Sequence, residues 1–199
     1  MRAIFAIFCL CILAQARFVL NEGEIITPML AEKIEILGAE TQDKTGVGVY
    51  ILATKSLGGA SLENYALNFI SNLSSPYALL VFAEAEHKVE IYGSPEALAL
   101  FDREQILSVG SRGRIIPIIA SQKKDLNQTQ KIGVYNAALL NGYAEICDQI
   151  AASKGIGLEN SIGNTNNNFI NFLRYIFYAT LIFALGSYLY KKGRKNGAK

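Results

Sequence analysis

The sequence predicts an α/β domain, a small mixed β-sheet with helices packed on it, followed by one C-terminal transmembrane helix. Two short apolar segments, VYILAT and YALLVFA, are separated by an amphipathic stretch, which is the pattern of a strand–helix–strand unit. A segment of alternating polarity, KVEIY, follows the second apolar segment and predicts one more strand. Near the C-terminus, residues 169–190 are apolar on all sides, as expected for a helix in a bilayer.

The N-terminus has the pattern of a secretory signal peptide. One arginine precedes a short apolar run, and the segment ends in Ala14-Gln15-Ala16. Small residues at these two alanine positions are typical of a cleavage site, so residues 1–16 are predicted to be removed after Ala16. An uncleaved N-terminal anchor is the alternative, although the apolar run is short for a bilayer about 30 Å thick.

The predicted exported domain spans residues 17–155, and a helix opens it. Thr27 and Pro28 form a cap and a first-turn proline, and apolar residues then recur at helical spacing as far as Gly46. Residues 47–54 are apolar and β-branched, which predicts a buried strand. Ser61 is placed to cap the helix that follows, over residues 61–73.

A β-hairpin is predicted next. Residues 77–83 form a continuous apolar run, typical of a central strand, and residues 88–92 alternate as in a half-exposed strand. The connection between them is short enough for a hairpin turn. Since strand–helix–strand crossovers place their strands in parallel, the sheet should be mixed.

The last part of the domain is predicted to be helical. Pro95 opens a helix over PEALALFDREQIL, and a long helix is expected in residues 131–155. Between them, RIIPIIAS contains Pro117, which excludes a central strand there. Cys147 is the cysteine left after cleavage, so no intramolecular disulfide is possible and a buried small side chain is expected.

Residues 156–199 at the C-terminus predict a membrane anchor. Residues 156–168 are an Asn-rich linker, residues 169–190 a transmembrane helix about 33 Å long, and residues 191–199 a basic tail. Positive charge marks the cytoplasmic side of a membrane. A single-pass protein is therefore expected in the cytoplasmic membrane, with its main domain periplasmic or otherwise extracytoplasmic and its C-terminus cytoplasmic.

The charge of the exported part argues against nucleic acid as a partner. Residues 17–168 hold 12 Lys and Arg against 17 Asp and Glu, which gives a net charge of −5 although the whole chain carries +2. Nucleic-acid binding needs a basic face on the folded domain. The membrane itself and a membrane protein complex are the expected partners.

The order of elements and several local motifs resemble the TPM domain family over residues 18–153. These motifs are TGVGVYILATKSL, the GASLENYA that follows, and YALLVFAEAEHKVEIYG. The resemblance implies an exported domain often followed by one membrane helix, in a family that includes thylakoid-lumen phosphatase-like and photosystem-repair proteins. This chain departs from the family pattern at IYGSPEA, where paired glycines are missing.

Four carboxylates are the candidate metal ligands. The resemblance implies that the hairpin end meets the next helix, so that Glu84, Glu86, Glu96 and Asp102 could cluster and bind Ca²⁺ or Mg²⁺ weakly. Scattered surface charge is the alternative, because tight Asp, Asn and Gly spacing is absent. His87 is expected to be a solvated turn residue, and no catalytic residue or organic cofactor is predicted.

The sequence therefore favours a non-enzymatic factor in the assembly, maintenance or modulation of a membrane protein complex. Two alternatives stay open. The resemblance implies a weak acid phosphatase, which would need a convergent catalytic set. The acidic residues favour a binding module that responds to divalent cations.

Overall fold

The computed structural model describes residues 18–21, 25–121 and 125–162, together with Tyr178. The chain divides into two compact units, residues 1–161 and 162–199. The predicted signal peptide, most of the predicted membrane span, the basic tail and the end of the linker lie outside the described residues. None of the described helices combines the length and the apolar character that crossing a bilayer requires.

A four-stranded mixed sheet forms the centre of the first unit. Its strands are β1 (Val19–Asn21), β2 (Gly48–Thr54), β3 (Tyr77–Ala83) and β4 (Lys88–Gly93), and they lie in the order β1-β2-β3-β4. The first three strands are parallel, and β4 pairs antiparallel with β3. The prediction of a mixed sheet with a terminal hairpin is therefore confirmed.

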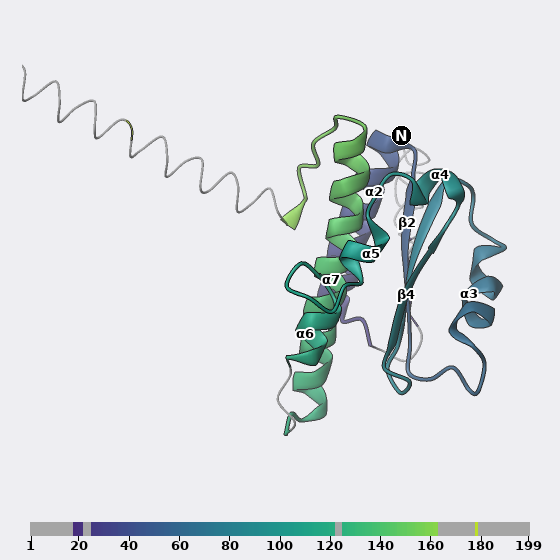
Figure 1. Ribbon diagram of the computed structural model, residues 1–199, viewed down its shortest axis with the longest axis vertical. Helices are drawn as coiled ribbons and strands as arrows, with labels where there is room; N and C mark the ends of the chain where they lie inside the picture. Colours follow the sequence, from purple (N-terminus) through teal and green to yellow (C-terminus); the bar gives the residue numbers. More distant parts are fainter. Residues whose placement is uncertain (1–17, 22–24, 122–124, 163–177, 179–199) are drawn as a thin grey trace, which may run out of the picture. The chain divides into compact units, whose positions relative to one another are not determined.

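Helices cover both faces of this sheet (Figure 1). The helices α2 (Pro28–Thr45) and α7 (Gln128–Ser153) lie on one face, and α3 (Leu62–Ile70) lies on the other. Phe82 of β3 packs against Tyr135 of α7, with ring centroids 5.0 Å apart and the ring planes tilted by 51°. The buried Tyr143 hydroxyl donates a hydrogen bond of 2.7 Å to the Val49 carbonyl of β2. Burial on both faces explains why β2 and β3 read as continuous apolar runs.

The helix ends follow the capping residues in the sequence. The Thr27 side chain accepts a hydrogen bond from the Leu30 amide, and the Ser61 side chain accepts one from the Asn64 amide. The first helix ends at Gly46, whose φ of 74° lies in the left-handed region that favours glycine. These three residues confirm the predicted starts of α2 and α3 and the end of α2.

Four short elements differ from the predictions or were not predicted. The strand β1 was not predicted, because it has only three residues and depends on distant pairing with β2. The single helix expected after Pro95 is wrong, since α4 (Pro95–Leu98) and α5 (Arg103–Ile106) replace it. Asp102 leaves the helical conformation and its carboxylate caps the Gln105 amide, which starts a new helix. The segment around Pro117 forms the short helix α6 (Ile116–Ala120).

Cys147 lies in the core, as predicted. Its side chain is fully buried on α7, and burial raises the pKa of the thiol to about 12. A thiol with so high a pKa stays protonated at neutral pH, and only the thiolate is an effective nucleophile. Cys147 therefore acts as a packing residue.

Glu40 of α2 forms hydrogen bonds with the segment that follows α7. This carboxylate accepts hydrogen bonds from the Glu159 amide, and from the amide and the side chain of Asn160. Lys44 reaches Glu40 at 2.8 Å and Glu159 at 3.2 Å. Burial alone would raise the pKa of Glu40, but the hydrogen bonds from Lys44, Glu159 and Asn160 outweigh it and lower the pKa to about 2. Glu40 is thus a main contact that holds the end of the first unit, together with Lys44 and with the Ser161 hydroxyl, which donates to Asp148.

Replacing Glu40 should weaken the folded state in a pH-dependent way. Glu40→Ala is expected to lower the free energy of unfolding by about 1–3 kcal/mol at pH 7, because hydrogen bonds to a charged acceptor are lost. The folded pKa lies below that of an unfolded glutamate, so this contribution is complete above about pH 5 and disappears as the pH falls towards 2. Urea unfolding of the full chain at a series of pH values measures it.

Asp43→Ala is the matched control, since Asp43 is an exposed acid on the same helix. Its effect should stay within about 0.5 kcal/mol at every pH. Equal losses in both variants, or a Glu40→Ala loss that persists at pH 2, would contradict the role given to Glu40.

Candidate functional site

The turn between β3 and β4 contains the sole histidine of the chain and two of the predicted carboxylates. The His87 amide donates to the Glu84 carbonyl at 3.2 Å, and His87 itself has a φ of 49°. Both the positive φ and the exposure of His87 agree with the predicted solvated turn. Glu84 accepts a hydrogen bond of 3.1 Å from Gln128 at the start of α7.

Glu86 connects this turn to the loop after β2. One oxygen of its carboxylate accepts hydrogen bonds from the Ser56 hydroxyl at 2.8 Å and from the Leu57 amide at 2.9 Å. The bond from the Leu57 amide, followed by that from Ser56, lowers the pKa of Glu86. The other oxygen, Oε2, is enclosed and has no hydrogen-bond partner among the described residues. The two hydrogen bonds to Glu86 therefore fix the turn against the loop after β2.

The structure does not bring the four predicted metal ligands together. Glu84 and Glu86 lie at the hairpin turn, whereas Glu96 and Asp102 follow the far end of β4. With six residues at about 3.3 Å each, β4 separates the two pairs by roughly 17 Å. The expected approach of the hairpin end to the next helix is thus wrong, because β4 runs away from the turn before α4 begins. Among the described residues no group of three or more His, Cys, Asp or Glu side chains is arranged to hold a metal ion.

The carboxylates at the far end have local structural partners. Asp102 caps α5, and its amide donates a hydrogen bond of 2.7 Å to the Gln149 side-chain oxygen. Glu96 lies in the first turn of α4 and accepts a hydrogen bond from Ser75. A hydrogen bond with its own amide, followed by one with Ser94, lowers the pKa of Glu96. Both side chains therefore stabilise helix starts.

A small cavity of about 320 Å³ lies beside the hairpin turn. Basic and polar side chains line it together with one tyrosine and one carboxylate: Lys55, Glu84, His87, Gln128, Lys131 and Tyr135 among them. It lies at the carboxyl ends of β2 and β3, the edge where open α/β sheets usually bind ligands.

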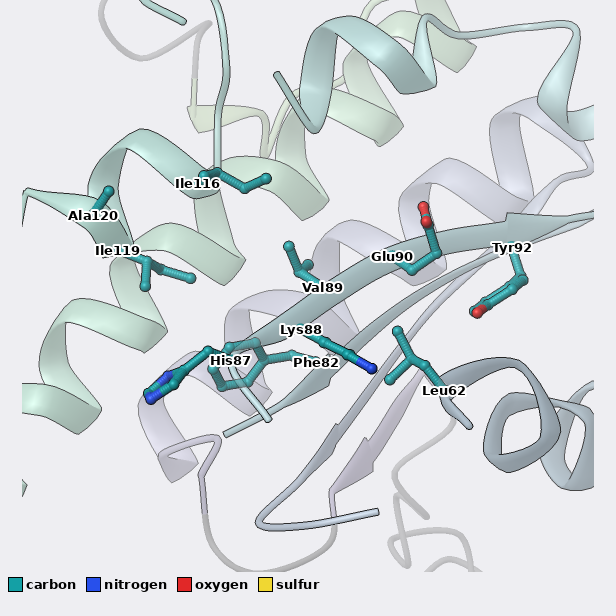
Figure 2. Close-up of a pocket in the computed structure, with 10 residues that line it drawn as sticks. All are labelled: Leu62, Phe82, His87, Lys88, Val89, Glu90, Tyr92, Ile116, Ile119 and Ala120. Carbon is teal, nitrogen blue, oxygen red and sulfur yellow. The ribbon is translucent and has the colours of Figure 1, made fainter. Parts of the chain in front are cut away.

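A larger groove, of about 490 Å³, runs along β4 (Figure 2). Apolar side chains from three parts of the fold surround it, namely Leu62 of α3, Phe82 and Val89 of the hairpin, and Ile116 and Ile119 of α6. His87, Lys88, Glu90, Tyr92 and Ala120 complete its walls. Its chemistry is that of a surface for another apolar molecule or chain, with charged groups at the rim.

The helix α6 is unusual because it is apolar throughout and yet half-exposed. Its sequence is IPIIA, and none of its five residues is buried. Isolated exposed apolar residues are common, but a contiguous set beside a groove indicates an interaction surface. Sequence reasoning treated this segment only as an excluded strand. The signal that was available is the run RIIPIIAS itself, which is too apolar for an ordinary loop.

The sequence profile of the TPM domain matches residues 19–149, which is well over half of the chain. The chain belongs to the TPM domain family. The resemblance inferred from the sequence motifs is therefore confirmed. The match covers the whole sheet and nearly all of α7.

A solved structure shares the fold at low sequence identity. The N-terminal domain of a protein from P. gingivalis, determined by NMR, is similar with a TM-score of 0.54 and 15% identity, covering 72% of this chain and 88% of its own. The N-terminal domain of a Corynebacterium glutamicum protein gives a TM-score of 0.44 and 9% identity, with coverages of 70% and 80%. No curated protein matched the chain.

Divalent cations should bind weakly or not at all to this TPM domain. The carboxylates are divided between two ends of β4, and one oxygen of Glu86 already accepts two hydrogen bonds. We expect a Kd for Ca²⁺ and Mg²⁺ on the order of millimolar or no detectable binding. Calorimetry on the full chain in detergent measures it, and Glu86→Gln should remove any signal that exists.

Asp102→Asn is the matched control because Asp102 lies at the other end of β4 and should not contribute. Micromolar affinity that is lost in Asp102→Asn would show that the four acidic residues do form one site. The conclusion that β4 keeps Glu84 and Glu86 apart from Glu96 and Asp102 would then be wrong.

Proposed function

We propose that this TPM domain is a binding domain held at the outer face of the cytoplasmic membrane, where it assists the assembly, maintenance or modulation of a membrane protein complex. The groove beside β4 is the observation that carries this proposal. It combines an apolar lining with a half-exposed apolar helix, which is the composition of a protein-docking surface.

The sequence supplies the membrane part of the proposal. The predicted signal peptide, the apolar segment 169–190 and the basic tail agree on one topology, with the TPM domain outside. A short linker would keep such a domain near the membrane, where its local concentration relative to membrane proteins is high. The partner is therefore expected to be another protein of the same membrane.

A role in binding also agrees with how the charged side chains of the domain are used. Glu40, Glu86 and Asp102 each hold a loop or a helix start in place, and Arg103 pairs with Glu90 at 2.8 Å. Of these, Glu86 fixes the hairpin turn next to His87 and Lys88, which line the groove. A rigid surface loses less conformational entropy on binding.

Crosslinking in intact cells tests this function. A photoreactive p-benzoylphenylalanine in place of Ile119 should give a discrete adduct with an integral membrane protein, because Ile119 lines the groove. The same group in place of Leu67 is the control, since Leu67 is 51% exposed but lies on α3 and does not line the groove. The adduct at Ile119 should fall at least about fivefold when Ile116→Asp is added, because a charge would then enter the apolar contact.

Adducts of equal yield at both positions, or adducts with only soluble proteins, would argue against a membrane partner at the groove. Hydrolysis of p-nitrophenyl phosphate by the purified full chain, lost in His87→Ala, would favour the phosphatase alternative instead.

A further inference from the structure

The strand β4 is the last strand of the sheet, so one of its two sides has no neighbouring strand. Antiparallel strands alternate between residues that bond to the partner strand and residues that point away from it. The Ser94 amide donates to the Tyr77 carbonyl, and the Glu84 amide donates to Thr54 of β2. Together with the register, these bonds show that the backbone N–H and C=O groups of Lys88, Glu90 and Tyr92 face β3. The backbone groups of Val89 and Ile91 therefore point to the side without a neighbouring strand, where Val89 is half-exposed and Ile91 is buried.

The Ile91 amide on this open side is covered by a carboxylate. It donates a hydrogen bond of 2.9 Å to Glu90 Oε1, and Arg103 holds the same carboxylate at 2.8 Å. Charged groups that cover edge donors are a known means of preventing unwanted strand pairing. Val89, two residues earlier, borders the groove of about 490 Å³. The open edge thus has one covered amide and one that faces the groove.

The side walls of the groove match the alternation of a strand. On the face of the sheet that carries α7, Val89 lies near Ile116 and Ile119, and on the other face Tyr92 lies near Leu62 (Figure 2). Successive side chains of an extended peptide point to opposite faces. A peptide beside β4 would therefore place one set of side chains against α6 and the other set against Leu62 and Tyr92.

The rim of the groove carries positive charge where β4 begins. Lys88 is exposed and lines the groove, and the exposed His87 precedes it. Glu90 is already paired with Arg103 further along the strand. A carboxylate opposite Lys88 would complement this end of the groove.

We propose that the groove binds an extended segment of the partner protein as an added strand antiparallel to β4, with apolar residues opposite Val89 and Tyr92 and an acidic residue opposite Lys88. The inference rests on the proposed function and specifies how the partner is held. The main chain of the partner forms a pair of hydrogen bonds at the half-exposed Val89, and its carbonyl takes the place of Glu90 at the amide of Ile91, which is buried in the free chain.

A synthetic peptide tests the inference directly. The probe is fluorescently labelled Ser-Val-Val-Thr-Val-Asp-Gly, blocked at its C-terminus, whose aspartate falls opposite Lys88 and whose third valine falls opposite Val89. Fluorescence anisotropy with the full chain in detergent should give a Kd on the order of 100 µM. Replacing the aspartate by lysine should weaken binding at least about fivefold, and more at low salt.

Val89→Pro removes the outward amide and leaves the ladder to β3 intact, since proline is tolerated on an edge strand when its nitrogen faces outward. We expect binding at least about tenfold weaker. Val89→Thr keeps the amide and the branched shape, so its affinity should change by less than about threefold. Glu90→Ala uncovers the Ile91 amide and should tighten binding by about threefold or more.

A probe methylated on the backbone nitrogen of its third valine gives the same test with the unaltered protein. It should bind at least about tenfold more weakly, because this nitrogen is the one that donates to the Val89 carbonyl. Undetectable binding of the parent peptide at 1 mM, or equal binding of the methylated probe, would overturn strand addition. If Ile119 still forms adducts with a membrane protein but the labelled peptide does not bind, the proposed function stays in place and only this inference is rejected.

Discussion

Burial of β2 and β3 on both faces is the constraint from which the rest of the structure follows. Helices α2 and α7 lie on one face of the sheet and α3 lies on the other, and nearly every residue of β2 and β3 is inaccessible to water. Such strands must lie in the middle of a sheet. The short β1 and the half-exposed β4 are thereby left at the two edges.

The two edge strands, β1 and β4, differ in length and in how their outward amides are covered. At β1, the Glu35 carboxylate accepts hydrogen bonds of 2.9 Å from the amides of Phe18 and Val19, and the strand is only three residues long. At β4, the strand has six residues, and Glu90 covers the Ile91 amide from its own neighbouring position. The carboxylates at both edges are half-exposed, but β4 is the longer strand and borders the groove of about 490 Å³. This difference makes β4 the edge suited to an interaction.

The sequence was sufficient for the central elements because their signals are local. Continuous apolar runs gave β2 and β3, and the caps Thr27 and Ser61 gave the starts of α2 and α3. Features that depend on contacts between distant parts of the chain could not be predicted from these local patterns. The strand β1 exists through its pairing with β2, and the helix break follows from the cap at Asp102. The four carboxylates were expected together, but the direction of β4 separates them.

Amide exchange along β4, measured residue by residue by NMR, tests the account most directly. In the free full chain, the amides of Lys88, Glu90 and Tyr92 should exchange slowly, because they bond to β3, and the Val89 amide should exchange at least about tenfold faster. Saturation with the Ser-Val-Val-Thr-Val-Asp-Gly peptide should slow Val89 and leave the other three unchanged. Slow exchange at Val89 in the free protein, or no change when the peptide binds, would show that the edge of β4 is not the docking surface.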